Sequence, residues 1–419
     1  MQKYDLVVIG GGPAGLAAAI TAYEKGIRSI VILERDNELG GILNQCIHSG
    51  FGLQSFRQEL TGPEFASRYI KRIKESGIDY RLNTTVLKIE EKIVTVINMQ
   101  EGLFKIAAEA IILAMGCREK PRGYLGIPGY RPSGIFTAGT AQKMINIYGY
   151  LPGKEVVILG SGDIGLIMAR RLTLEGAVVR VVAEILPYAA GLKRNLVQCL
   201  EDYGIPLMLS HTVTDIKGKE RVEGVTLAQV DQEKRVIQGT EKYYACDTLL
   251  LSCGLVPENE LSRKAGLIIN PITLGPSVNE SMETSKEGIF ACGNVLHVHD
   301  LADSVVKEAA LAGTGAAEYI KKGKSRETQK KIRVCPGEGI RYVVPETINM
   351  GRAADFLEIR LRVRKEQEKC FIRVYSAGER IFEQRKEMVS PGKMEEVTIA
   401  KEMLSSCGGM RTLEIRLEE

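Results

Sequence analysis

Two glycine-rich turns constrain the fold of this chain more than any other feature. In each turn, three glycines separate an apolar run from a pattern typical of a helix. They are Gly10, Gly12 and Gly15 in DLVVIGGGPAGLAAAI, and Gly160, Gly162 and Gly165 in EVVILGSGDIGLIMARRL. The first glycine permits a tight turn, the second lets a pyrophosphate approach the backbone, and the third lets helix and strand pack closely. One such pattern is weak, but two of them predict two dinucleotide sites in one chain.

A glutamate follows each turn at the distance expected for a carboxylate that binds ribose. Glu34 ends the apolar run SIVILE, and Glu184 ends VVRVVAE. Such a carboxylate accepts hydrogen bonds from the ribose hydroxyls. Because Glu184 would repel a 2′-phosphate, we interpret the second site as one for NAD(H) rather than NADP(H). The alternative, that either glutamate only ends a strand in solvent, stays open.

Composition narrows the class of protein. The 419 residues are 44% hydrophobic and 26% charged, with a net charge of +4, which are ordinary values for a globular chain and give no basis to expect nucleic acid as a partner. No apolar run is long enough for a transmembrane segment, and the N-terminus does not read as a signal peptide. The nine cysteines include no CxxC pair. Together these features predict a cytoplasmic protein with reduced thiols.

The order of the elements predicts an α/β fold with two Rossmann-like domains, each a three-layer arrangement of sheet, β-meander and helices. The first domain is expected over residues 1–120 and, because the segment GIFACGN is too short to fold alone, again over 268–325. The second is expected over 150–267. The expected local elements of the first domain are a helix over 62–75, strands over 85–89 and 93–98, and a later helix from near Asp300.

The end of the chain has a different character. The segments FLEIRLRV, CFIRVY, EEVTI and TLEIRL alternate apolar and polar residues with the period of a half-buried strand. They predict a small antiparallel sandwich-like domain over 332–419, without a catalytic constellation. The basic stretch Lys321–Lys331 is interpreted as the solvated linker that leads to it, and CGGM as one of its turns.

With these residues in view, the chain resembles the two-dinucleotide-binding-domain flavoproteins, the family of thioredoxin reductase and the pyridine nucleotide-disulfide oxidoreductases. The resemblance covers roughly residues 1–325. It rests on both glycine turns, on the strand end LAMG at Gly116 and on FACGN at Gly293. It implies FAD at the first site and NAD(H) at the second.

The resemblance also implies which residues contact each cofactor. FACGN ends in Asn294, where the family usually has an aspartate, so a hydrogen-bonding group is kept and a charge is lost. The N–H groups of Asp303–Val306, at the start of the later helix, are expected to face the flavin and stabilise its anionic reduced form. The implied FAD set is Gly10, Gly12, Pro13, Ala14, Gly15, Glu34, Arg35, Gly40, Gly41, Gln45, Val86, Ala114, Gly116, Gly293, Asn294, Asp303, Val305 and Val306. The implied NAD set is Gly160, Gly162, Asp163, Ile164, Gly165, Glu184 and Gly254.

Two longer segments, GGILNQCIHSGFGLQSFRQELTGPEFA and GNVLHVHDLADSVVKEAALAG, are similar to the flavoprotein subunit encoded beside anaerobic glycerol-3-phosphate dehydrogenases. Similar chains are subunits of dye-linked amino-acid dehydrogenases. This resemblance implies an FAD-dependent NAD(H) oxidoreductase that passes hydride between nicotinamide and flavin as an electron-transfer subunit. The implied partner is a dehydrogenase subunit, which could also hold the chain at a membrane, and the oligomeric state stays open.

The redox position departs from the disulfide reductases. Those enzymes carry two cysteines after the Gly-Gly pair, whereas GGILNQCIHS has Cys46 alone, and one thiol cannot form the relay disulfide. Cys46 is the one candidate catalytic residue, as the thiol of a stand-alone NADH oxidase or peroxide reductase. We favour the other interpretation, a small packing residue. A third hypothesis is a non-catalytic subunit that holds FAD for assembly.

The histidines do not form a convincing pattern. His297 and His299 lack a second pair of ligands at metal-like spacing, so we predict no metal and expect a polar loop near the flavin. His48 lies two residues after Cys46, but catalysis by it is not expected.

Overall fold

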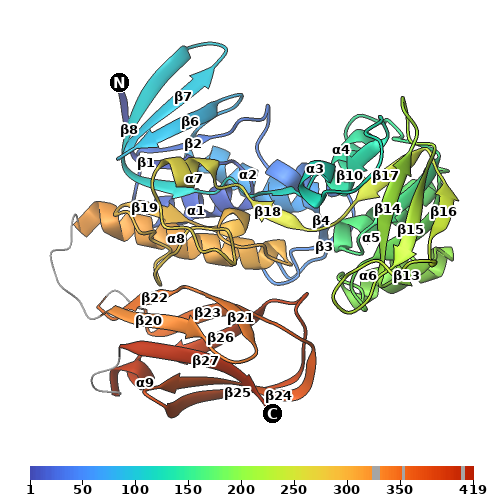
Figure 1. Cartoon of the computed structure of the whole chain (residues 1–419). Coiled ribbons are helices and arrows are strands. Elements are labelled where there is room, and N and C mark those ends of the chain that lie inside the picture. The colour runs from blue at the N-terminus through green and yellow to red at the C-terminus, as the bar shows by residue number, and fades with distance from the viewer. Residues whose placement is uncertain (323–330, 352–353, 407–410) are drawn as a thin grey trace. The chain divides into compact units, whose positions relative to one another are not determined.

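The computed structural model describes residues 1–322, 331–351, 354–406 and 411–419, so most of the expected linker and the CGGM turn lie outside the described residues. By their contacts, the described residues divide into two compact units, which Figure 1 colours along the chain. Unit 1 comprises Met1–Asn44, Ser49–Cys117 and Pro257–Glu419, and unit 2 comprises Gln45–His48 and Arg118–Val256. The first unit therefore includes the C-terminal domain.

Unit 1 is built on a sheet whose central strands are parallel. Strand β1 lies between β2 and β8, and β19 pairs with β8 on the other side. The long strand β8 pairs with two strands along its length. Its second half pairs parallel with β1, and its first half pairs antiparallel with β7. The strands are β1 (Gln2–Ile9), β2 (Ile30–Leu33), β5 (Asp79–Arg81), β6 (Thr85–Glu90), β7 (Ile93–Asn98), β8 (Gly102–Leu113) and β19 (Ile289–Ala291).

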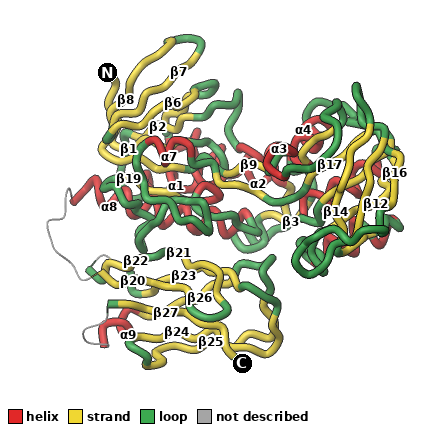
Figure 2. The backbone as a smooth tube through the Cα atoms, viewed as in Figure 1, coloured by secondary structure: helices red, strands yellow, loops and turns green. Residues whose placement is uncertain are grey.

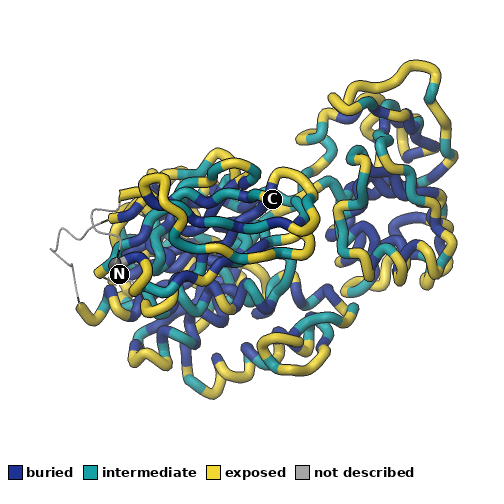
Figure 3. The backbone as a smooth tube through the Cα atoms, turned by 90° about the horizontal axis from the view of Figure 1, so that it is seen from below, coloured by how far each residue is buried: buried dark blue, intermediate teal, exposed yellow. Residues whose placement is uncertain are grey.

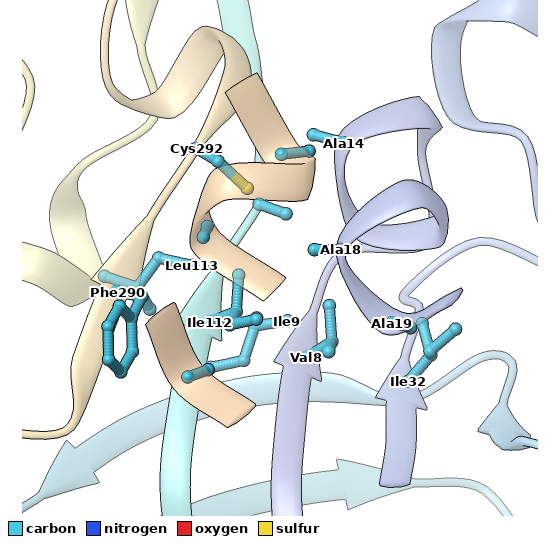
Figure 4. Packing of buried hydrophobic residues seen from close by; sticks show 14 of the residues in the cluster. Val8, Ile9, Ala14, Ala18, Ala19, Ile32, Ile112, Leu113, Phe290 and Cys292 are labelled. Carbon is cyan, nitrogen blue, oxygen red and sulfur yellow. The ribbon is translucent and has the colours of Figure 1, made fainter. Parts of the chain in front are cut away.

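Helices α1 (Pro13–Glu24), α2 (Gly62–Ser76) and α8 (Ala302–Lys322) complete this part of unit 1. The sequence predicts that it binds a nucleotide, and we call it the nucleotide-binding part. Helix α1 packs closely against α8, where a Cβ atom on Gly313 would lie 2.4 Å from the carbonyl oxygen of Ala18. Figure 4 shows Ala14 and Ala18 on the side of α1 that faces α8. Helix α2 begins at a capping box in which Thr61 and Glu64 exchange hydrogen bonds. The short elements of unit 1 are β3 (Ser49–Phe51), β4 (Leu60–Thr61), α7 (Glu260–Lys264) and η3 (Gly293–Val295). Three further short elements include residues of both units: η1 (Gly41–Gln45), β9 (Cys117–Glu119) and β18 (Leu255–Pro257).

Unit 2 has a five-stranded parallel sheet in the order β10-β17-β11-β12-β13 and an antiparallel meander β14-β15-β16. The alternation along β11 places Val156 and Ile158 against the helices, and Val157 and Leu159 against the meander. The strands are β10 (Ile135–Thr137), β11 (Glu155–Leu159), β12 (Val178–Glu184), β13 (Leu207–Leu209), β14 (His211–Lys217), β15 (Gly224–Gln229), β16 (Lys242–Ala245) and β17 (Thr248–Leu251). The helices are α3 (Arg122–Leu125), α4 (Ala138–Asn146), α5 (Asp163–Leu174), α6 (Lys193–Cys199) and η2 (Glu201–Tyr203).

The C-terminal domain, which we call the C-terminal module (residues 331–419), consists of two sheets around a shared apolar core (Figure 2). One sheet has the order β22-β20-β27-β24-β25 and the other has the order β21-β23-β26. The expected antiparallel arrangement is wrong for one pair, because β20 and β27 run parallel; their long separation in sequence permits this. The elements are β20 (Lys331–Pro336), β21 (Ile340–Val344), β22 (Thr347–Asn349), β23 (Phe356–Val363), β24 (Gln367–Ser376), β25 (Glu379–Val389), β26 (Glu395–Ala400), α9 (Lys401–Ser406) and β27 (Thr412–Glu418).

The observed architecture confirms the predicted α/β class with a β-rich C-terminal part. Strands in both units are largely buried while many turns are exposed (Figure 3). Among the helices of the described residues, none is both long and apolar enough to cross a membrane.

Candidate functional site

The first glycine turn joins β1 to α1 in a conformation that requires glycine. Gly10 has φ +108°, and a Cβ atom there would lie 2.4 Å from the carbonyl oxygen of Ala114. A Cβ atom on Gly15 would lie 1.9 Å from the carbonyl oxygen of Gly10. The turn therefore brings together Gly10, Gly15 and Ala114, three residues of the predicted FAD set.

The N-terminus of α1 provides donors and room for an anion. Within the described residues no side chain caps this helix at Gly12, and Pro13 follows as the first helical residue. Beside Gly12 the space is open, with the Cα of Gly41 at 3.9 Å from the position of an added Cβ. Gly40 donates its N–H to the carbonyl oxygen of Gly11 at 2.9 Å. A glycine-lined helix N-terminus, whose first N–H groups have no carbonyl partner within the helix, fits a pyrophosphate.

Glu34 supports this turn from the end of β2. The residue is 7% exposed, and its carboxylate accepts hydrogen bonds from the N–H groups of Gly11 at 2.6 Å and Asp36 at 2.8 Å. Thr84 donates its N–H to the carbonyl oxygen of Glu34, which places the segment leading to Val86 beside this strand end. Each oxygen of the Glu34 carboxylate keeps a second lone pair, so the carboxylate can also accept a hydrogen bond from a ribose hydroxyl. The predicted neighbour Arg35 is exposed.

The segment at Gly293, which is the later of the predicted FAD motifs, lies directly against the first turn of α1. Gly293 has φ +73°, and a Cβ atom there would lie 2.7 Å from the Cβ of Ala14 and 3.3 Å from Cγ1 of Val305. Three segments of the predicted FAD set therefore meet here, although they are far apart in the sequence. Asn294 accepts the N–H of His299 at 3.0 Å, and its Nδ2 lies 3.5 Å from the sulfur of Cys117.

The start of α8 has a structural role that the sequence did not indicate. The carboxylate of Asp303 accepts the N–H groups of Gly52 at 3.1 Å and Ser55 at 2.7 Å. It thereby fixes the loop between β3 and β4 against α8. Helix α8 begins at Ala302, near the expected start, and Val306 is buried.

The second glycine turn repeats the first in unit 2. Gly160 has φ +96°, and a Cβ atom there would lie 2.3 Å from the carbonyl oxygen of Ser252. Glu184 accepts hydrogen bonds from the N–H of Ser161 at 2.8 Å and from its hydroxyl at 2.6 Å. Glu184 and Ser161 therefore occupy the same positions in the second repeat as Glu34 and Gly11 in the first. In both repeats the glutamate accepts the backbone N–H of the turn residue.

The second turn also carries contacts that the first does not have. Asp163, the first residue of α5, accepts the N–H of Leu192 at 2.8 Å and the side-chain amide of Asn195 at 2.7 Å. Ala190 donates its N–H to the hydroxyl of Ser161 at 2.8 Å. The segment 190–195 is therefore attached to the turn. The predicted residue Gly254 is exposed and has φ +97°.

The segment Gln45–His48 groups with unit 2. The Gln45 side chain donates to the carbonyl oxygen of Gly139 at 2.8 Å and to the side-chain oxygen of Gln142 at 3.0 Å. The Cys46 sulfur lies 3.7 Å from the same Gln142 oxygen. Burial raises the pKa of the Cys46 thiol to about 12, so at neutral pH it is protonated and a poor nucleophile.

A buried polar cluster follows the Gly293 turn. His297, His299 and Glu308 bring atoms of metal-ligand type within 4.8 Å of one another. We predicted no metal because the sequence pattern showed no further ligand beside the two histidines. In the structure the carboxylate of Glu308, from α8, lies in that position. The side chain of Arg360, however, is 1% exposed, and its Nη1 lies 3.7 Å from the Glu308 carboxylate. The positive charge of this guanidinium disfavours binding of a metal cation beside it, so we propose no metal here.

This cluster predicts a pH dependence of stability. Burial lowers the pKa of His297 from 6.5 to about 4, against the raising effect of Glu308, while His299 and Arg360 lower it further. The ring of Tyr342 also faces His297. The unfolded chain binds a proton more readily than the folded one between these values, so the free energy of unfolding should fall by about 2–3 kcal/mol as the pH drops from 6.5 to 4.

The measurement is denaturant unfolding of the wild type and of His297→Gln between pH 7 and pH 4. The wild type should lose more stability on acidification than the variant. His211→Gln, at a more exposed histidine that bonds the carbonyl oxygen of Leu209, is the matched control and should follow the wild type. Parallel curves for the wild type and His297→Gln would contradict a neutral, buried His297.

The chain is similar to known proteins over most of its length. The family model described as pyridine nucleotide-disulphide oxidoreductase matches residues 4–312. The chain is 28% identical over 313 residues to the hydrogen cyanide synthase component HcnB of Pseudomonas protegens, which is a subunit by name, covering 69% of this chain and 65% of that protein. It is 24% identical over 337 residues to an opine oxidase subunit of Agrobacterium tumefaciens, covering 75% and 63%. The matched region thus spans slightly less than two thirds of these relatives.

Other similar proteins include one whose name does not describe it as a subunit and two solved structures. An NADH oxidase of Methanocaldococcus jannaschii is 29% identical over 337 residues, covering 76% of this chain and 68% of that protein. The T. acidophilum thioredoxin reductase structure has a TM-score of 0.61 at 22% identity, covering 76% of this chain and 99% of that chain. A NAD-dependent persulfide reductase from A. fulgidus has a TM-score of 0.59 at 22% identity, covering 94% and 71%. These two structures are similar in fold.

Proposed function

The chain belongs to the pyridine nucleotide-disulphide oxidoreductase family, and from that premise we propose that it passes hydride between NAD(H) and FAD as the electron-transfer subunit of a multi-subunit dehydrogenase. Members of this family are oxidoreductases that bind FAD and NAD(P)H. One observation carries the proposal. The same glycine turn, supported by a glutamate that accepts a backbone N–H of the turn, occurs once in each unit.

In unit 1, the chain's residues would hold FAD along one continuous set of elements. The open N-terminus of α1 at Gly12 would donate to the pyrophosphate, and Glu34 would accept hydrogen bonds from the adenosine ribose. Gly293 and Asn294 would approach the other end of the cofactor, next to the start of α8. Bound flavin supplies the redox chemistry, while these residues supply binding and orientation.

In unit 2, Glu184 supports NAD(H) rather than NADP(H) as the nicotinamide substrate. The residue is 5% exposed, and its carboxylate accepts hydrogen bonds from Ser161 and from the N–H of Leu186 at 3.0 Å. A 2′-phosphate near this fixed negative charge would be repelled. No general acid or base is needed for hydride transfer between the two cofactors, so none is assigned.

A partner polypeptide is supported by two of the relatives, since HcnB and the opine oxidase protein are subunits by name. We propose that the partner is a dehydrogenase subunit of the type found in anaerobic glycerol-3-phosphate dehydrogenases. Purification of the tagged chain from its source, followed by identification of attached polypeptides, tests this. A stoichiometric dehydrogenase polypeptide is the expected result, and a chain that purifies alone with full NADH turnover would contradict the proposal.

Replacing Cys46 separates this function from a thiol-based peroxide or oxygen reductase. Because the thiol is buried and its pKa is about 12, only about one molecule in 10⁵ carries the thiolate at pH 7. Cys46→Ser should therefore retain NADH–dye activity within about twofold. The measurement is steady-state dye reduction beside peroxide-dependent NADH oxidation. Cys199→Ser, a second buried cysteine in unit 2, is the matched control, and loss of peroxide turnover in Cys46→Ser alone would support the thiol mechanism instead.

A further inference from the structure

From Ile359 to Val363, strand β23 of the C-terminal module is buried on both faces, which is unusual for a strand with alternating charges. Its apolar face, with Leu357 and Ile359, lies in the core of the module. The opposite face carries Arg360 and Arg362, which are 1% and 9% exposed. Buried guanidinium groups are costly unless they are paired and hydrogen-bonded. Their partners therefore show what this face is built to contact.

Two partners of Arg362 lie in the loop that precedes α8, and two lie in the module itself. Its Nη2 donates to the carbonyl oxygen of Val298 at 3.1 Å and forms an ion pair with Asp300. The Nε donates to the hydroxyl of Tyr342 at 3.2 Å, and Tyr342 itself packs in the core of the nucleotide-binding part. Arg362 thus joins the module to the segment that follows the Gly293 turn.

Further ion pairs join the module to α8 itself. Lys307 forms ion pairs with Glu358 at 2.7 Å and Glu396 at 2.6 Å. Glu358 also binds Nη2 of Arg360 at 2.8 Å. Charged groups of both signs therefore lie on each side of this contact, so the module is positioned in a defined register rather than by apolar area alone.

Glu308 connects these charges to the predicted flavin site. Its side chain is fully buried, and one carboxylate oxygen accepts the N–H of Gly293 at 2.8 Å. The other oxygen lies 2.7 Å from Nε2 of His297, 3.3 Å from Nε2 of His299 and 3.7 Å from Nη1 of Arg360. Burial opposes ionisation of this group, but the two imidazoles hold the pKa of Glu308 well below its usual range.

We propose that Arg360 is a positioning residue for the flavin: through Glu308 it holds the Gly293–Asn294 turn in its binding conformation, so the C-terminal module completes the FAD site. This inference rests on the proposed function, which places FAD at that turn. Arg360 compensates the Glu308 charge, and Glu308 in turn fixes the Gly293 N–H. His299 adds a second link, because its own N–H fixes Asn294.

The test uses the full chain with Arg360→Met and with Glu308→Gln, which retains an acceptor for Gly293. Arg360→Met should weaken FAD binding at least tenfold, measured by flavin fluorescence. It should also lower the flavin midpoint potential, since an uncompensated carboxylate disfavours the anionic reduced flavin. Glu308→Gln should raise the potential, and a tenfold change in the reduction equilibrium corresponds to about 30 mV for a two-electron couple.

The double variant Arg360→Met/Glu308→Gln should bind FAD within about threefold of the wild type, because no uncompensated carboxylate then remains at position 308, and Glu358 keeps its ion pair with Lys307. Arg373→Met is the matched control; it removes an arginine of the same module that pairs with Glu383 and Glu418, and should leave both readouts unchanged. If Arg360→Met does not fold, Glu308→Gln and the double variant decide the question.

Unchanged FAD affinity and potential in Arg360→Met, or an unchanged potential in Glu308→Gln, would overturn the proposal. So would a double variant that binds FAD no better than Arg360→Met. A purely structural contact would lower the melting temperature without moving the potential. A wild type that binds no FAD would instead refute the proposed function, so the two failures are distinguishable.

Discussion

Gly10→Ala should fold and purify without flavin. Any side chain at this position would place its Cβ 2.4 Å from the carbonyl oxygen of Ala114, on a backbone with φ +108°. The turn would have to open, which moves the N-terminus of α1 away from the pyrophosphate. We expect FAD affinity to fall at least a hundredfold, about 2.7 kcal/mol, as measured by fluorescence titration of the apoprotein.

Gly123→Ala is the matched control for this change. Gly123 lies in α3, and nothing lies within 4 Å of the position of an added Cβ. This variant should bind FAD as the wild type does. Stoichiometric FAD in Gly10→Ala would show that the first turn does not hold the cofactor.

Gly160→Ala, the equivalent change in the second turn, should have a different effect. Its Cβ would lie 2.3 Å from the carbonyl oxygen of Ser252, on a backbone with φ +96°. Because this turn lies in unit 2, the protein should keep its FAD and lose NADH binding by at least a hundredfold. The measurement is flavin reduction by NADH in a stopped-flow instrument.

Chemical reduction provides the internal control for Gly160→Ala. Dithionite should reduce the flavin of the variant and of the wild type to the same extent, since it needs no nucleotide site. If NADH reduces the variant at the wild-type rate, the second turn is not the NAD(H) site. A colourless Gly160→Ala would show that the two turns do not have separate roles.

Local elements were predictable from the sequence where the signal is periodic. The helix expected over 62–75 is α2 (Gly62–Ser76), and the strand expected from FLEIRLRV is β23 (Phe356–Val363). Alternation along β23 indicates which residues share a face. It does not indicate what covers the polar face, and so the burial of Arg360 and Arg362 against α8 could not be foreseen.

The candidate site was predictable only as far as the motifs reach. The spacing of the glycine turns indicated tight turns at Gly10 and Gly160, and both residues have positive φ. Their close contacts are with the carbonyl oxygens of Ala114 and Ser252, which follow β8 and β17 far along the chain and which the spacing alone does not indicate. The cluster around Glu308 depends on groups from the Gly293 turn, α8 and β23, and no local pattern links them. Likewise, Gln45 follows the glycines of the first site, yet its hydrogen bonds are with Gly139 and Gln142, about a hundred residues away.

Anaerobic titration of the purified, FAD-loaded chain with NADH tests the central claim most directly. One equivalent of NADH should bleach the visible flavin band completely, while NADPH at the same concentration should act far more slowly because of Glu184. A flavin that stays oxidised under NADH, or a chain that takes up no FAD, would contradict the account.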